Sequence, residues 1–74
     1  MLSGRQCRVA RAALGWSVAE LARQTGLSEK AIQKFEAEAV DARMSTVKSI
    51  ERAFTKNGVE PVTIDDWDAV RWRP

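Results

Sequence analysis

Hydrophobic residues recur at helical spacing through most of the chain. The first set is spaced by three and four positions, the period of one buried helix face, and comprises Cys7, Ala10 and Leu14. Ser3 precedes this set, and Gln6 follows three residues later, which is the spacing of a capping box. The pattern predicts a first helix that begins after Ser3 and ends at Gly15.

Two further helices are predicted on either side of a short glycine turn. Ser17 opens one of them, with Glu20 at the spacing of a second capping box, and Gly26 ends it. Ser28 then caps the next helix after a single intervening residue. The inward positions of these two helices are Val18, Leu21, Ala22, Ile32 and Phe35.

A fourth helix follows a segment, 37–44, that shows no clean period and is predicted to be a loop. Ser45 or Thr46 is expected to cap this helix, and Asn57–Gly58 to end it. Its apolar stripe is Val47, Ile50, Ala53 and Phe54.

The tail changes to a period of two, which predicts a short hairpin. Val62 and Ile64 alternate with Pro61 and Thr63, and Val70 and Trp72 alternate with Arg71 and Arg73. Asp65-Asp66-Trp67-Asp68 is expected to form the polar turn. Two strands alone are marginal in water, so the hairpin must pack on the helices or pair with a second chain.

Length and composition fit one small folded domain. The 74 residues are 45% hydrophobic and 30% charged, and their net charge is +2. No apolar run approaches the roughly 20 residues that span a bilayer, and the N-terminus lacks a secretory pattern. We expect a cytoplasmic, mainly α protein with a compact four-helix domain (1–60) and a short C-terminal β-hairpin (61–74). A core this small also favours oligomerisation.

Few residues are available for catalysis or metal binding. The chain has no His and a single cysteine, Cys7, which we expect to be a small buried hydrophobe. Asp65 and Asp66 are better interpreted as turn residues than as catalytic carboxylates. We therefore predict no enzyme, no cofactor, no metal and no small-molecule substrate.

The charges are unevenly distributed along the chain. Residues 1–34 carry a net charge of +4, whereas 35–60 and 61–74 each carry −1. A basic first half fits one face directed at a polyanion, but charge alone favours an ordinary solvated surface.

Residues 17–36 carry the functional signal. Two short helices joined by a tight turn that contains glycine form a helix-turn-helix, whose second helix enters the DNA major groove. The outward face of that helix (28–37) carries Glu29, Lys30, Gln33, Lys34 and Ala37. Lysine donates to guanine, glutamine bonds adenine, and glutamate accepts from cytosine; Glu29 can instead favour the helix dipole. The helix starts at Ser17 and Ser28 offer backbone amides to phosphates.

The stretch from Gln6 to Val59 resembles the helix-turn-helix domain of the phage Cro and repressor type, the XRE family. The residues on which this resemblance rests are Arg11 to Ser17, Ala19 to Ala22, Gly26 to Ser28, Ile32, Phe35-Glu36, Thr46-Val47, Ile50 and Gly58-Val59. The resemblance implies a transcriptional regulator that dimerises on double-stranded DNA. It implies base contacts from Ser28, Glu29, Lys30, Gln33 and Lys34. It also implies a phosphate contact from Ser17, an ion pair between Arg11 and Glu36, and dimer contacts from the hairpin.

The chain departs from the family pattern near the expected phosphate contacts. Val18 replaces a favoured Gln, and Glu38 replaces a favoured Gly. Val40 takes the usual basic position and Ala42 replaces a Pro, so Arg43 is the expected compensating phosphate contact. These departures motivate an alternative function as a protein-interaction module, an adaptor or an antitoxin.

The three tryptophans are expected to differ in role. Trp16 is interpreted as a lid on the core. Trp67 and Trp72 are equally compatible with covering the core and with anchoring a partner.

Overall fold

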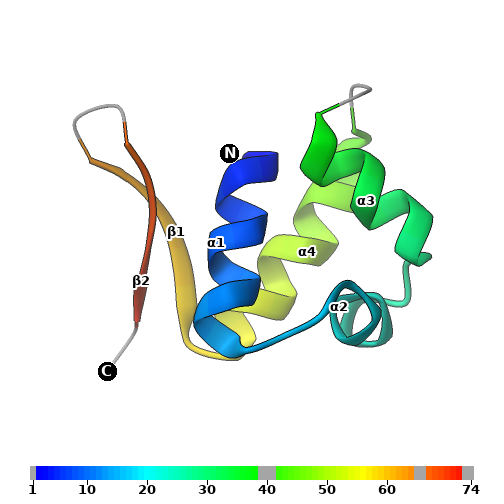
Figure 1. Cartoon of the computed structure of the whole chain (residues 1–74), viewed down its shortest axis with the longest axis horizontal. Coiled ribbons are helices and arrows are strands. Elements are labelled where there is room, and N and C mark those ends of the chain that lie inside the picture. The colour runs from blue at the N-terminus through cyan, green and yellow to red at the C-terminus, as the bar shows by residue number, and fades with distance from the viewer. Residues whose placement is uncertain (1, 39–41, 65–66, 73–74) are drawn as a thin grey trace.

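Four helices and a C-terminal β-hairpin make up the computed structural model, which describes residues 2–38, 42–64 and 67–72 (Figure 1). The helices and strands are α1 (Gly4–Leu14), α2 (Val18–Thr25), α3 (Glu29–Ala37), α4 (Met44–Lys56), β1 (Val59–Ile64) and β2 (Trp67–Trp72). The expected mainly α class with a short hairpin is confirmed. No helix in the described part of the chain is long and apolar enough to cross a bilayer.

The first three helices begin at the predicted serine caps. Ser3 and Gln6 form the complete capping box, with the Gln6 amide donating to Ser3 Oγ and the Ser3 amide donating to Gln6 Oε1. Ser17 and Ser28 cap α2 and α3 in the same way through the amide three residues on. Gly15 and Gly26 end α1 and α2 with left-handed backbone.

Two predicted caps are wrong. The Glu20 side chain does not return to the start of α2; its Oε2 accepts instead from Arg23 and Gln24. α4 begins at Met44 with Arg43 at the cap position, not at Ser45 or Thr46. No side-chain hydrogen bond caps that helix, so its start carries no local sequence signal.

The hairpin begins earlier than predicted, and its two strands are longer than predicted. β1 begins at Val59, and β2 begins at Trp67, so Trp67 and Asp68 belong to a strand and not to the turn. The strands pair antiparallel, with Val59 opposite Trp72 and Val62 opposite Ala69. The predicted turn residues Asp65 and Asp66 lie outside the described residues, as does Val40.

All four helices and β1 contribute to one hydrophobic core. Its members are Leu2, Cys7, Ala10, Leu21, Ile32, Phe35, Val47, Ile50, Ala53, Phe54 and Val59. The whole predicted stripe of α4 is among them. Trp16 packs against this core as expected, because its ring stacks on Phe54 with 5.9 Å between ring centroids.

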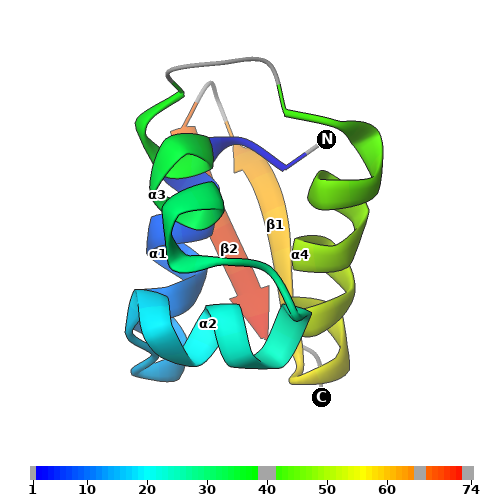
Figure 2. The ribbon, with the colours of Figure 1, turned by 90° about the vertical axis from the view of Figure 1, so that its right-hand side faces the viewer.

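The hairpin packs on the helices through one face. α1 contacts both strands and α4 contacts β1, as the two views in Figures 1 and 2 show. Val59 is buried there and Val70 packs against the core. Gln6 Nε2 also donates to the Val62 carbonyl at 3.0 Å, which ties the start of α1 to β1. The hairpin and α3 thus lie at opposite ends of the long axis, which measures 29 Å.

Candidate nucleic-acid interface

α3 has one buried face and one exposed face. Ile32 and Phe35 enter the core, and α3 packs against α1 and α2. All five residues predicted to contact bases are exposed, namely Ser28, Glu29, Lys30, Gln33 and Lys34. Lys30 and Lys34 are one helical turn apart, so both lie on the same side of α3. The fold therefore presents a polar row of hydrogen-bond donors and acceptors on a short rigid helix.

The starts of α2 and α3 add backbone donors beside this row. The Ser17 hydroxyl accepts from the Glu20 amide at 3.0 Å, and the Ser28 hydroxyl accepts from the Ala31 amide at 3.1 Å. The earlier amides of each helix have no acceptor within the helix, as at any helix start. Both serines are exposed, so these amides are accessible to phosphate oxygens.

A buried ion pair locks α1 against α3. Arg11 Nε and Nη2 donate to the two carboxylate oxygens of Glu36 at 2.6 and 2.8 Å. The pair is well shielded, since the Glu36 and Arg11 side chains are only 7% and 18% exposed. Hydrogen bonding to Glu36 raises the pKa of Arg11. The two residues expected to pair are thus in direct bidentate contact across 25 positions of sequence.

Two further groups complete the network around this pair. Arg11 Nη1 donates to the Trp16 carbonyl at 3.0 Å, and the Cys7 thiol donates to Glu36 Oε2 at 3.1 Å. Burial and this hydrogen bond raise the pKa of the Cys7 thiol far above its usual range. Cys7 is therefore an uncharged donor in the core, in addition to the buried hydrophobe that was expected.

Glu38 adopts an unusual backbone conformation at the end of α3. Its φ of 54° is left-handed, and its amide donates to the carbonyls of Lys34 and Phe35. Glycine takes this conformation without strain, whereas a residue with a Cβ is strained there by roughly 1 kcal/mol. The side chain is exposed, so a carboxylate stands at the end of the candidate recognition helix.

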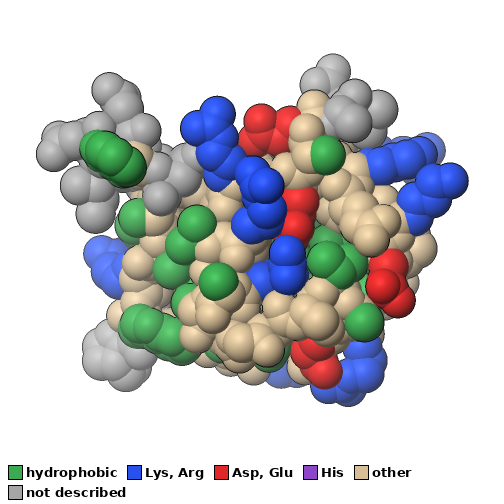
Figure 3. All heavy atoms as spheres, in the orientation of Figure 1, with side chains coloured by type: hydrophobic (Ala, Val, Ile, Leu, Met, Phe, Trp, Pro, Cys, Tyr) green, Lys and Arg blue, Asp and Glu red, His purple; other side chains and the backbone are tan. Residues whose placement is uncertain are grey.

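Several exposed basic residues lie outside α3. Arg43 is exposed at the cap of α4, and Arg5 and Arg8 are exposed on α1, where basic side chains gather near the centre of the face in Figure 3. α4 carries a further row at intervals of four, formed by Lys48, Arg52 and Lys56. This basic row lies in a segment, 35–60, whose net charge is −1, so it is apparent from helical spacing and not from net charge.

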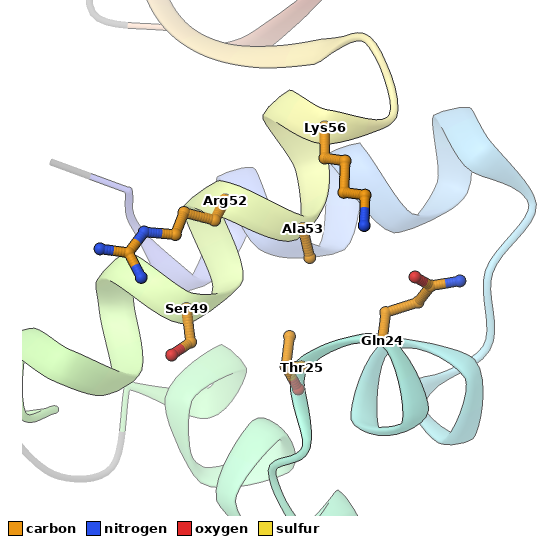
Figure 4. A pocket seen from close by; sticks show the side chains of 6 residues that line it. All are labelled: Gln24, Thr25, Ser49, Arg52, Ala53 and Lys56. Atoms are coloured by element: carbon orange, nitrogen blue, oxygen red, sulfur yellow. The ribbon is translucent and has the colours of Figure 1, made fainter.

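A pocket lies between the C-terminal end of α2 and α4 (Figure 4). It is lined by Gln24, Thr25, Ser49, Arg52, Ala53 and Lys56, none of them a predicted DNA contact. Its volume of about 230 Å³ is below the roughly 300–1,000 Å³ of small-molecule sites. In the described ranges, no group of three or more acidic, Cys or His side chains is arranged to hold a metal ion.

Comparison with known families agrees with this geometry. A family model described as helix-turn-helix matches residues 8–60, which include all four helices apart from the first turn of α1. No curated protein matches the sequence.

Proposed function

Because the chain belongs to the helix-turn-helix family of DNA-binding regulators, we propose that it binds a specific double-stranded DNA site with α3 in the major groove. The observation that carries this proposal is the two-faced character of α3. Ile32 and Phe35 fix the helix in the core, while Lys30, Gln33 and Lys34 remain exposed on its other side.

The regulator is proposed to act as a homodimer. Two copies related by a two-fold axis place their α3 helices in successive major grooves, about 34 Å apart, on a pseudo-palindromic site. A gel-shift titration against the DNA upstream of its own gene tests the proposal. Retardation of one fragment in preference to the others is expected, and equal affinity for every fragment at low salt contradicts it.

Replacing Lys34 with alanine is expected to reduce discrimination at one or two base pairs. A good base contact contributes about 1–3 kcal/mol of discrimination, so we expect roughly tenfold less preference for the native base there. The measurement is affinity for a panel of sites with single base changes.

Arg43→Ala is the matched control, because a phosphate contact carries no sequence information. This variant is expected to bind all sites more weakly by a similar factor. The slope of log affinity against log salt concentration should also become shallower by about one, because one fewer counterion is released. If Lys34→Ala also weakens every site equally, Lys34 contacts only the backbone.

Replacing Glu38 with glycine is expected to raise both stability and DNA affinity. Relief of the left-handed strain should add roughly 1 kcal/mol to the free energy of unfolding. Removal of a carboxylate from the DNA-facing end of α3 should strengthen binding several-fold at low salt, by about the same factor at every site. Chemical denaturation and binding titrations measure the two effects.

Glu38→Ala separates the two causes. It removes the charge but keeps a Cβ at a φ of 54°, so affinity is expected to rise without the gain in stability. Equal stability of the glycine and alanine variants contradicts the strain argument.

A protein-interaction role is the second candidate. The Glu38 carboxylate near the recognition helix and the exposed Trp67 and Trp72 favour it. Co-purification of a stoichiometric partner, with no retardation of any DNA, is the result that supports this role over the first.

A further inference from the structure

The exposed face of α4 carries a row of basic side chains without ionic partners. Lys48, Arg52 and Lys56 are all exposed, and Glu51, the one acidic residue of this helix, is half-buried. None of the three forms an ion pair with another described residue, whereas three arginines elsewhere each pair with a glutamate. Like charges four residues apart on a helix repel, so the row destabilises α4 and no contact in the described chain offsets this effect.

The side chains beside the row are small and polar. Ser45 and Ser49 are seven and three residues before Arg52, which places them on the same side of α4. The exposed large hydrophobic side chain of this helix, Met44, lies at its first residue, outside the row. Lysine is depleted at protein–protein interfaces, whereas lysine, arginine and serine are common donors to phosphate oxygens. The composition of this face therefore fits a nucleic-acid backbone better than a protein partner.

The row continues from the proposed DNA interface. Arg43, the proposed phosphate contact, caps α4, and the end of α3 lies at the same side of the molecule as the start of α4, at the top of Figures 1 and 2. From there α4 runs to the opposite side, where Arg52 and Lys56 line the pocket beside the end of α2 (Figure 4). The row thus begins near the end of the recognition helix and leads away from it.

The spacing of the row matches a phosphate backbone. An α-helix rises about 1.5 Å per residue, so the three basic residues follow at steps of about 6 Å along α4. Phosphates of one DNA strand follow at about 3.4 Å along the duplex axis, so every second phosphate lies about 6.8 Å further on. Lysine and arginine side chains are long and flexible enough to absorb the difference.

We propose that this row, Lys48, Arg52 and Lys56, binds the phosphate backbone of the DNA that flanks the site read by α3, on the same duplex. The inference rests on the proposed DNA-binding function and extends it beyond the base pairs that α3 contacts. Backbone contacts carry no sequence information, so the row adds affinity and salt dependence but no base preference. The protein therefore occupies a longer stretch of DNA than the one whose sequence it reads.

Two duplexes that share the site separate the contribution of the row from that of α3. One duplex ends at the site, and the other adds about ten base pairs, one helical turn, on each side. The wild type is expected to bind the longer duplex several-fold more tightly at physiological salt. Arg52→Gln combined with Lys56→Gln is expected to lose most of this gain. The slope of log affinity against log salt concentration on the longer duplex should become shallower by about two for each protomer.

Arg5→Gln combined with Arg8→Gln is the matched control. It also removes two exposed positive charges, but from α1, and leaves the row on α4 intact. Longer DNA raises the affinity of any basic protein because it carries more charge, and every exposed cation contributes to that general effect. The control is expected to keep most of the gain from the longer duplex. An equal loss in both double variants overturns the proposal. Circular dichroism checks that each variant is folded.

Two other results overturn the proposal. One is an Arg52→Gln, Lys56→Gln variant that keeps the full gain from the longer duplex. The other is capture of two separate duplexes by the wild type that this variant loses, because a second duplex and not the flanking DNA then lies on α4. The function of α3 is measured separately, as base preference on the short duplex. Retained preference without an effect of the row overturns this inference alone, whereas a wild type without preference overturns the proposed function.

Discussion

Replacing Arg11 with methionine is expected to lower the free energy of unfolding by about 3–5 kcal/mol, the effect of leaving a buried charge unpaired. Glu36 is 7% exposed and receives both of its strong hydrogen bonds from Arg11. The variant leaves that carboxylate with the Cys7 thiol as its remaining side-chain donor and removes the bond to the Trp16 carbonyl. Urea denaturation followed by circular dichroism measures the change.

A double-mutant cycle isolates the contribution of the pair. Arg11→Met combined with Glu36→Leu removes both charges, so much of the lost stability should return, because apolar replacement of a buried pair is often nearly neutral. Arg23→Met is the control for loss of an exposed pair, since the Arg23 side chain is 70% exposed beside Glu20, and we expect no measurable change there. An Arg11→Met variant as stable as Arg23→Met contradicts a structural role for the buried pair.

Local signals explain which parts of the fold were predictable. The Ser3 and Gln6 box and the stops at Gly15 and Gly26 depend on residues a few positions apart, and the structure contains all of them. The start of α4 was mispredicted because Arg43 caps it without a side-chain bond. The predicted turn included Asp68 because aspartate is typical of turns. Asp68 instead lies in β2, where pairing with β1 fixes the register.

The candidate site depended on longer-range information. Spacing placed Lys30, Gln33 and Lys34 on one helix face, but the pairing of Arg11 with Glu36 came only from family resemblance. The left-handed backbone at Glu38 had no local signal, because nothing in a glutamate predicts it; the family preference for glycine there was the available indication. The exposure of Trp67 and Trp72 was undecidable, since aromatic residues in strands serve cores and interfaces alike.

Gly4→Ala is expected to destabilise the protein by about 3 kcal/mol, the upper end of the usual effect of overpacking. A Cβ at Gly4 would lie 2.5 Å from the Phe35 carbonyl oxygen and 2.8 Å from that of Glu36. Both atoms belong to the backbone of α3, so they cannot move aside as a flexible side chain can. α1 must therefore shift away from α3, at the end where Leu2 enters the core. Thermal and urea denaturation measure the loss.

The sign of this effect makes the prediction specific. In an open helix, alanine is favoured over glycine by roughly 1 kcal/mol, so propensity alone predicts that Gly4→Ala is stabilising. The third neighbour of the new Cβ is Glu38 Cγ at 2.9 Å, which a second substitution, Glu38→Gly, removes. Because the two backbone oxygens remain, the double variant should recover only the gain that Glu38→Gly gives by itself. A Gly4→Ala variant as stable as the wild type would show that the start of α1 and the end of α3 are not held at this separation.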